Sequence, residues 1–236
     1  MRIYQDALEM IKEVERDLFE MGIRYQSYSV QDKIVENDSD YETIELIGTG
    51  YKLVPNEEGV FSNMEKLLEY KKDKYFQRWV YAEAGERLCG RGSNPGDAWK
   101  LRSEIWEPFI RRGRFSYSYA ERWREQLSYV THELAMNPNS RQVIMTMYDR
   151  HQDMMNWGGL DRVPCSLSYH FLIRDGRLNL IYNQRSCDFV NFFQADVYIT
   201  ITLQSYVANI LGVKTGLFVH NINSLHAFKK DLKGVF

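Results

Sequence analysis

Several short clusters gather the residue types used in covalent, acid–base and ligand-binding chemistry. Pro164-Cys165-Ser166 opens an apolar stretch, and residues 184–188 read Gln-Arg-Ser-Cys-Asp. Asp196 follows, two histidines lie within residues 220–226, and residues 137–141 upstream read Asn-Pro-Asn-Ser-Arg. A nucleophilic thiol, carboxylates and cations in this order make a covalent enzyme one candidate reading of the chain.

Each of these features also has a simpler explanation when it is taken alone. A single cysteine at the start of a strand, such as Cys165, is usually a small core residue. Asp196 at the start of a helix is typical of a capping carboxylate. Arg185 alone fits a solvated surface charge, and His226 alone fits a structural histidine. The argument for chemistry therefore depends on the combination.

The elements that must position these residues are a mixture of helices and strands. Apolar spacing predicts helices over residues 3–21, 60–76, 119–136 and 196–211. Strand patterns cover residues 43–54, 143–148, 167–173, 178–184 and 217–222. Residues 82–97 hold four glycines and a proline, which predicts a loop insertion. Without a regular βαβ repeat, we expect one α+β domain over residues 1–236, a mixed sheet flanked by helices.

Composition excludes several classes of protein. The 236 residues carry 30 Lys and Arg against 32 Asp and Glu, so no bulk attraction to nucleic acid or an anionic membrane is expected. No stretch approaches the ~20 apolar residues of a membrane helix. Three cysteines fit free thiols in a reducing compartment, which predicts a cytoplasmic protein, or the host cytoplasm if a phage encodes it. The Cys and His spacings match no zinc ligand set, so no metal is expected.

Taken in order, the clusters resemble the thymidylate synthase family, and within it the pyrimidine hydroxymethylases of phages. The resemblance is carried by Pro164-Cys165, by residues 184–188 and by residues 223–226 (Asn-Ser-Leu-His), with weaker similarity at residues 104–106 and 119–123. It implies a thymidylate synthase-like fold. It also implies one-carbon transfer to C5 of a pyrimidine nucleoside monophosphate, with 5,10-methylenetetrahydrofolate as co-substrate.

The resemblance also assigns roles in the chemistry. Cys165 would add to pyrimidine C6 as a thiolate, which makes C5 electron-rich, and Tyr119 would assist proton transfer at C5. Arg185 and Ser186 would bind the nucleotide phosphate. The same guanidinium would lower the pKa of the thiol.

The remaining roles concern the partner subunit, the sugar and the folate. Arg141 would reach the phosphate across a homodimer interface, so that each site depends on both subunits. His226 would hold the sugar 3′-hydroxyl. Trp106 and Asp188 would contact the folate.

Asp196 stands where the family's synthases have an asparagine, whose amide matches N3–H and O4 of uracil. A carboxylate instead accepts from the amino group of cytosine and stabilises a protonated N3, and a mismatched base leaves buried polar groups unpaired. Ser166, after the nucleophile, resembles the small hydroxyl residue of the hydroxymethylases. The expected activity is dCMP 5-hydroxymethylation. The alternatives are methylation of dUMP or dCMP, CMP hydroxymethylation, and a nucleotide-binding member without catalysis.

One departure concerns the family's catalytic glutamate, which the resemblance places on the helix predicted over residues 60–76. Lys66 occupies the matching position. Glu69 lies one helical turn further on near the same face and is the expected substitute. Glu65, about 100° around the helix, is the other candidate.

Three other departures keep the substrate and product open. Gln142 follows Arg141 where the family has a second arginine, which removes one positive charge. Phe228 replaces a tyrosine that shares the sugar hydroxyl, so a ribonucleotide such as CMP stays conceivable. The short segment ending at Phe236 would close poorly over the folate, which favours attack by water over hydride transfer.

Overall fold

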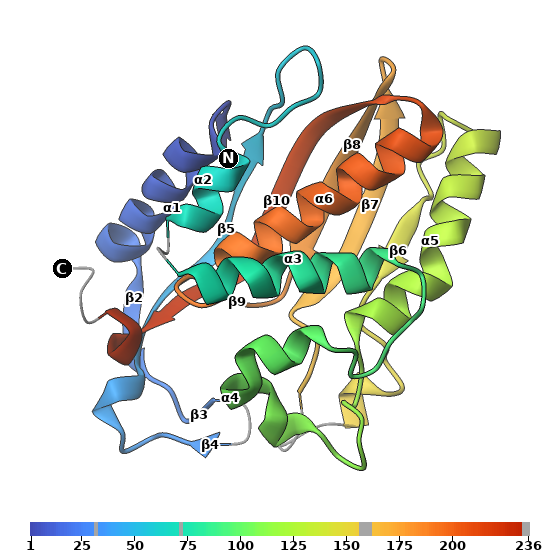
Figure 1. The fold of residues 1–236 in the computed structure, drawn as a ribbon. Coiled ribbons are helices and arrows are strands. Elements are labelled where there is room, and N and C mark those ends of the chain that lie inside the picture. Colours follow the sequence, from blue (N-terminus) through green and yellow to red (C-terminus); the bar gives the residue numbers. More distant parts are fainter. Residues whose placement is uncertain (31–32, 71–72, 156–161, 233–236) are drawn as a thin grey trace.

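An eight-stranded mixed sheet lies behind a layer of helices in Figure 1. The computed structural model describes residues 1–30, 33–70, 73–155 and 162–232. Six strands run in the order β1-β5-β10-β8-β7-β6, while β2 pairs with β5 and β9 with β10. The strands are β1 Arg2–Tyr4, β2 Ile23–Gln26, β5 Glu42–Leu53, β6 Ile144–Thr146, β7 Ser166–Arg174, β8 Arg177–Gln184, β9 Cys187–Asp188 and β10 Lys214–Phe228. Strand β10 runs parallel to β8 and antiparallel to β5. A hairpin of β3 Ser29–Val30 and β4 Lys33–Ile34 forms a separate small sheet.

Five helices cover one face of this sheet in the part of the chain that the structure describes (Figure 1). They are α1 Ala7–Met21, α2 Met64–Glu69, α3 Lys74–Leu88, α5 Tyr119–Met136 and α6 Phe193–Leu211, with the short α4 Ser103–Trp106 nearby. Helix α6 packs on β8 and β10, and α3 packs on α6 in turn. Because it is covered on both sides, α6 is apolar around most of its circumference.

Local sequence explains where the helices begin and end. Asp6 and Ser118 accept hydrogen bonds from the first backbone N–H groups of α1 and α5. Gly212, with φ of 65°, ends α6 in the left-handed conformation that glycine adopts without strain. A buried bidentate ion pair from Arg122 to Asp153, with both N···O distances 2.8 Å, ties α5 to the turn after β6.

Several predicted boundaries were wrong. The helix predicted over residues 60–76 is two helices, α2 and α3, and residues 82–88 continue α3 where a loop insertion was expected. Good helix formers surround Gly85 there, and the packing of α3 on α6 outweighs the cost of one glycine. Helix α1 begins at Ala7 because residues 2–4 pair with β5, and β10 extends to Phe228.

None of the helices within the described ranges has the length and apolar character needed to span a bilayer.

Candidate active site

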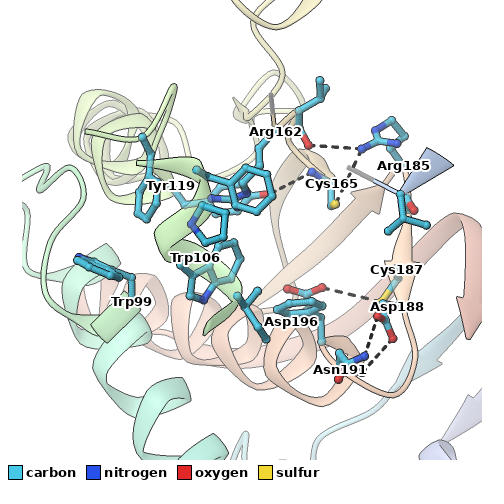
Figure 2. A pocket seen from close by; sticks show the side chains of 18 of the residues that line it. Trp99, Trp106, Tyr119, Arg162, Cys165, Arg185, Cys187, Asp188, Asn191 and Asp196 are labelled. Atoms are coloured by element: carbon cyan, nitrogen blue, oxygen red, sulfur yellow. Dashed lines mark hydrogen bonds between the residues drawn. The ribbon is translucent and has the colours of Figure 1, made fainter. Parts of the chain in front are cut away.

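A cavity of about 860 Å³ opens where β8 ends, beside the first turn of α6 and the side of α3. Figure 2 shows its lining, with Trp106 and Arg162 on one wall and Asp188 and Asn191 on another. Of the residues singled out in the sequence, the cavity lining includes Trp106, Tyr119, Cys165, Arg185, Ser186, Asp188, Asp196 and His226. A polar, aromatic-walled cavity of this size suits a small planar ligand.

Cys165 and Arg185 are held together by the pairing of β7 with β8. The backbone N–H of Arg185 donates to the carbonyl of Cys165 at 2.7 Å. Its guanidinium lies 3.9 Å from the Cys165 sulfur and also donates to the carbonyl of Pro164 (Figure 2). Burial raises the pKa of the Cys165 thiol, and the charges of Arg185 and Arg162 oppose that effect. The arginine therefore acts in the expected direction, but burial outweighs it in the unliganded protein.

Tyr119, the first residue of α5, places its hydroxyl against the backbone of Cys165 and Ser166. Its oxygen accepts the backbone N–H groups of Cys165 and Ser166 at 3.1 and 3.2 Å. Since these two bonds use its acceptor capacity, the hydroxyl has only its own proton to offer. Burial raises the pKa of Tyr119, so that proton is retained near neutral pH. The geometry makes Tyr119 a proton donor beside the thiol.

Asp196 lies in the first turn of α6, on the side of the cavity facing Cys187 (Figure 2). Its Oδ2 accepts from the amide nitrogen of Gln184 at 2.6 Å and lies 3.8 Å from the Cys187 sulfur. Burial raises the pKa of Asp196 to about 6. At neutral pH the side chain is therefore an ionised acceptor that lines the cavity.

Aromatic rings form the wall around Trp106. This ring stacks on Trp79 with centroids 6.3 Å apart, and the guanidinium of Arg162 lies 4.1 Å from the Trp106 centroid. On the neighbouring wall both carboxylate oxygens of Asp188 accept from Asn191, at 2.9 and 3.0 Å. A flat apolar surface beside a fixed carboxylate fits a pterin ring, which has a planar face and N–H groups at its edge.

The two acidic residues that the sequence suggests as catalytic lie away from the cavity. Glu69 is exposed at the end of α2 and lies outside the cavity lining, as does Glu65. Among the acidic residues that line the cavity is Glu83 of α3, which accepts from the Nε of buried Arg87 at 2.8 Å. The sequence contains a signal for this pair, an acidic and a basic residue four positions apart, but the glycines of residues 82–97 predict a loop there. Glu86 also lines the cavity, and its carboxylate accepts backbone N–H groups instead.

Arg141 is exposed before β6 and lies outside this cavity. Its carbonyl accepts from Nε2 of His170 at 3.1 Å. Strand alternation puts His170 on the sheet face opposite to Tyr169 and Phe171, which pack under the helices. Within its own subunit, Arg141 therefore has no access to the thiol.

Among the residues with described positions, no cluster of three or more His, Cys, Asp or Glu side chains could hold a metal ion. The cavity brings together a thiol, a guanidinium, a tyrosine and a buried carboxylate, the groups that a nucleophilic enzyme site for a planar, anionic ligand requires.

Comparisons with known proteins give the family. The family model "Thymidylate synthase" matches residues 70–235, and the chain belongs to the thymidylate synthase family. Two proteins named putative thymidylate synthase, from Methanosarcina barkeri and Methanosarcina acetivorans, are each 32% identical over 123 residues, 50% of this chain and 55% of theirs. One from Methanocaldococcus jannaschii is 30% identical over 115 residues, 48% of this chain and 52% of its own. The chain thus spans about half the length of these curated relatives.

The fold is also that of the family. The solved structure of thermostable thymidylate synthase A from Bacillus subtilis superimposes with a TM-score of 0.74 at 19% identity, covering 97% of this chain and 82% of that one. The predicted α+β class, a mixed sheet flanked by helices in one domain, is confirmed.

Proposed function

We propose that this protein hydroxymethylates a cytosine nucleotide, with dCMP as the first candidate. In this reaction dCMP, 5,10-methylenetetrahydrofolate and water give 5-hydroxymethyl-dCMP and tetrahydrofolate. The observation that carries the proposal is Asp196, an ionised carboxylate in the same cavity as the Cys165 thiol. An acceptor there matches the amino group of cytosine and opposes the O4 of uracil.

The side chains of the cavity supply the steps that need the protein. The Cys165 sulfur forms a bond to C6 of the base and is expelled again at the end. Tyr119, whose oxygen is held by two backbone N–H groups, moves a proton between C5 and solvent. The folate, bound against Trp106 and Asp188, supplies the one-carbon unit. We assign to the Glu83 carboxylate, which lines the cavity, the orientation of the water that becomes the new hydroxyl.

The nucleotide phosphate would lie against Arg185 and Ser186, at the start of the turn after β8. The Arg185 side chain is exposed to the cavity and close to the sulfur, so a bound phosphate would share its charge with the thiol. His226 lines the same cavity and is the group proposed for the sugar hydroxyl.

Homodimerisation through the helix-free face of the sheet is part of the proposal. Half-buried apolar side chains on that face include Leu172 of β7, Ile181 of β8 and Val219 of β10. Arg141 is exposed and bonded to His170, which lies on the same face. Pairing two copies there would cover the apolar side chains and let Arg141 reach the partner's phosphate.

One observation favours a second substrate, CMP. Phe228 lies beside His226 with ring centroids 5.2 Å apart, and it offers no hydroxyl to the sugar. Selection of deoxyribose therefore has one fewer polar contact than the resemblance implies.

The test is tritium release from C5-labelled dCMP, CMP and dUMP, with and without methylenetetrahydrofolate, followed by product mass. We expect release from dCMP and a product heavier by one hydroxymethyl group, and no release by Cys165→Ser. A gain of methyl would make the protein a methylating synthase. Release from CMP alone would show that the substrate is a ribonucleotide. No release from any of the three nucleotides would favour a binding protein without catalysis.

A further inference from the structure

A row of aromatic side chains crosses four strands beneath the cavity. Tyr169, Tyr182, His220 and Tyr51 are neighbours in register on β7, β8, β10 and β5. The Tyr169 and Tyr182 rings stack at 4.9 Å, and Tyr182 and His220 stack at 4.5 Å. All four side chains are buried and none lines the cavity. An imidazole in this position needs polar partners on both nitrogens, because an unpaired buried polar atom is costly.

His220 finds those partners in a chain of hydrogen bonds that ends at the cavity. Its Nδ1 lies 2.9 Å from the hydroxyl of Tyr51, and its Nε2 lies 2.8 Å from Oε1 of Gln184. The amide nitrogen of Gln184 donates to Oδ2 of Asp196 at 2.6 Å. Three hydrogen bonds thus connect Tyr51 to Asp196. We call these four residues the Tyr51–Asp196 relay.

The direction of the relay follows from its charged end. An ionised carboxylate only accepts, so Gln184 must turn its nitrogen toward Asp196 and its oxygen toward His220. Nε2 of His220 must then carry the proton, and Nδ1 must accept from the hydroxyl of Tyr51. Burial lowers the pKa of His220 to about 3, which leaves the ring neutral with one proton to place. Every donor in the relay points toward Asp196.

We propose that His220 and Tyr51 are positioning residues for base discrimination, which hold the Gln184 amide so that Asp196 stays an acceptor. The inference rests on the proposed function. Without the Tyr51 hydroxyl, the ring proton can move to Nδ1, and the lone pair on Nε2 then attracts the nitrogen of Gln184. The Gln184 oxygen would turn toward Asp196, an arrangement that requires a protonated, donating carboxyl group. The single proton of that group is then engaged by Gln184, and the neutral side chain no longer carries the charge that stabilises a protonated N3 of cytosine.

The test compares two variants that each remove one hydroxyl from the same aromatic row. Tyr51→Phe breaks the relay. Tyr182→Phe removes a hydroxyl that bonds Ser166 at 2.7 Å and leaves the relay intact. The measurements are kcat/KM and Kd for dCMP and for dUMP.

For Tyr51→Phe we expect the preference for dCMP over dUMP to fall by about tenfold or more. This is the effect of losing one hydrogen bond to a charged group, here the bond from Gln184 to Asp196. Tyr182→Phe can lower activity on both bases, because Ser166 adjoins the nucleophile, but its preference should equal that of the wild type. If the role of Tyr51 were purely structural, Tyr51→Phe would lower kcat/KM for dCMP and for dUMP by the same factor. An unchanged preference in Tyr51→Phe would overturn the inference.

Nitrogen NMR of the histidine rings gives a second readout that needs no activity. In protein labelled with ¹⁵N-histidine, His220 should be neutral with its proton on Nε2 at pH 7, and His220→Phe identifies its signals. Tyr51→Phe should show both tautomers. A proton on Nδ1 or a charged ring in the wild type would refute the relay, whichever nucleotide is the substrate. Normal tautomers in a protein that binds neither base would instead count against the proposed function and, with it, the role in discrimination.

Discussion

Replacing Asp196 by asparagine should stabilise the unliganded protein at neutral pH. Burial raises the pKa of Asp196 from 3.8 to about 6, so the unfolded chain releases this proton more readily than the folded protein does. When the pKa of a carboxyl group is higher in the folded protein than in the unfolded chain, its contribution to stability is present at low pH. That contribution is lost as the pH rises from about 4 to 6. The gap between the two pKa values corresponds to about 3 kcal/mol. Asparagine resembles the neutral acid and can still accept from Gln184.

Urea unfolding of both proteins at two pH values measures this effect. At pH 7.5 we expect Asp196→Asn to unfold with a free energy about 3 kcal/mol larger than the wild type, narrowing to about 1 kcal/mol at pH 4.5. Asp188→Asn is the matched control, because that carboxylate lies in the same cavity but accepts two hydrogen bonds from Asn191. It should show no such gain.

Two results would refute the reasoning. One is an Asp196→Asn protein that is less stable than the wild type at pH 7.5. The other is a difference in the free energy of unfolding that stays the same at pH 4.5 and pH 7.5, since a titrating Asp196 must make the difference smaller at the lower pH. In the same variant, tritium release should shift from dCMP toward dUMP. A gain in stability without that shift would mean that the buried Asp196 destabilises the fold but does not select between cytosine and uracil.

Three further predictions concern other parts of the site and fold. Glu83→Gln should slow product formation by roughly 10²- to 10⁴-fold, the range for a lost acid–base group, while Glu69→Gln should keep wild-type rates; equal rates in both would remove Glu83 from the mechanism. Arg185→Gln should slow alkylation of Cys165 by iodoacetamide severalfold at pH 7.5, read by peptide mass, because the guanidinium lowers the thiol pKa; a faster reaction would contradict this. Asp153→Ala should lower the free energy of unfolding by about 3–5 kcal/mol in urea, because it leaves a buried guanidinium without its partner; a loss below about 1 kcal/mol would show that the pair is solvated.

The parts of the site that the sequence predicted lie in short, continuous motifs. Cys165 and Arg185 come from two paired strands joined by a tight Asp175-Gly176 turn, so their proximity follows from local pattern. Helix α5 was predicted at its exact bounds, because Ser118 caps it and residues 137–140 break it.

The missed parts depend on register and packing. Glu83 is not predicted as a site residue because the glycines after it suggest a loop, although α3 continues through Gly85 to Leu88 under the packing of α6. The relay could not be predicted, because Tyr51 and His220 meet only through the antiparallel register of β5 with β10. No local pattern in the sequence encodes that register.

The same pairing of β5 with β10 determines when the candidate site can exist during synthesis. Leu53 pairs with Phe218 and Thr43 with Phe228, so two adjacent central strands come from distant parts of the chain. Closing so long a loop costs entropy before its contacts form, which makes this a slow step of folding. A nascent chain that has emerged as far as residue 185 already carries Cys165 and Arg185. The cavity, whose lining includes Ser224 and His226 of β10, is complete only when β10 docks between β5 and β8.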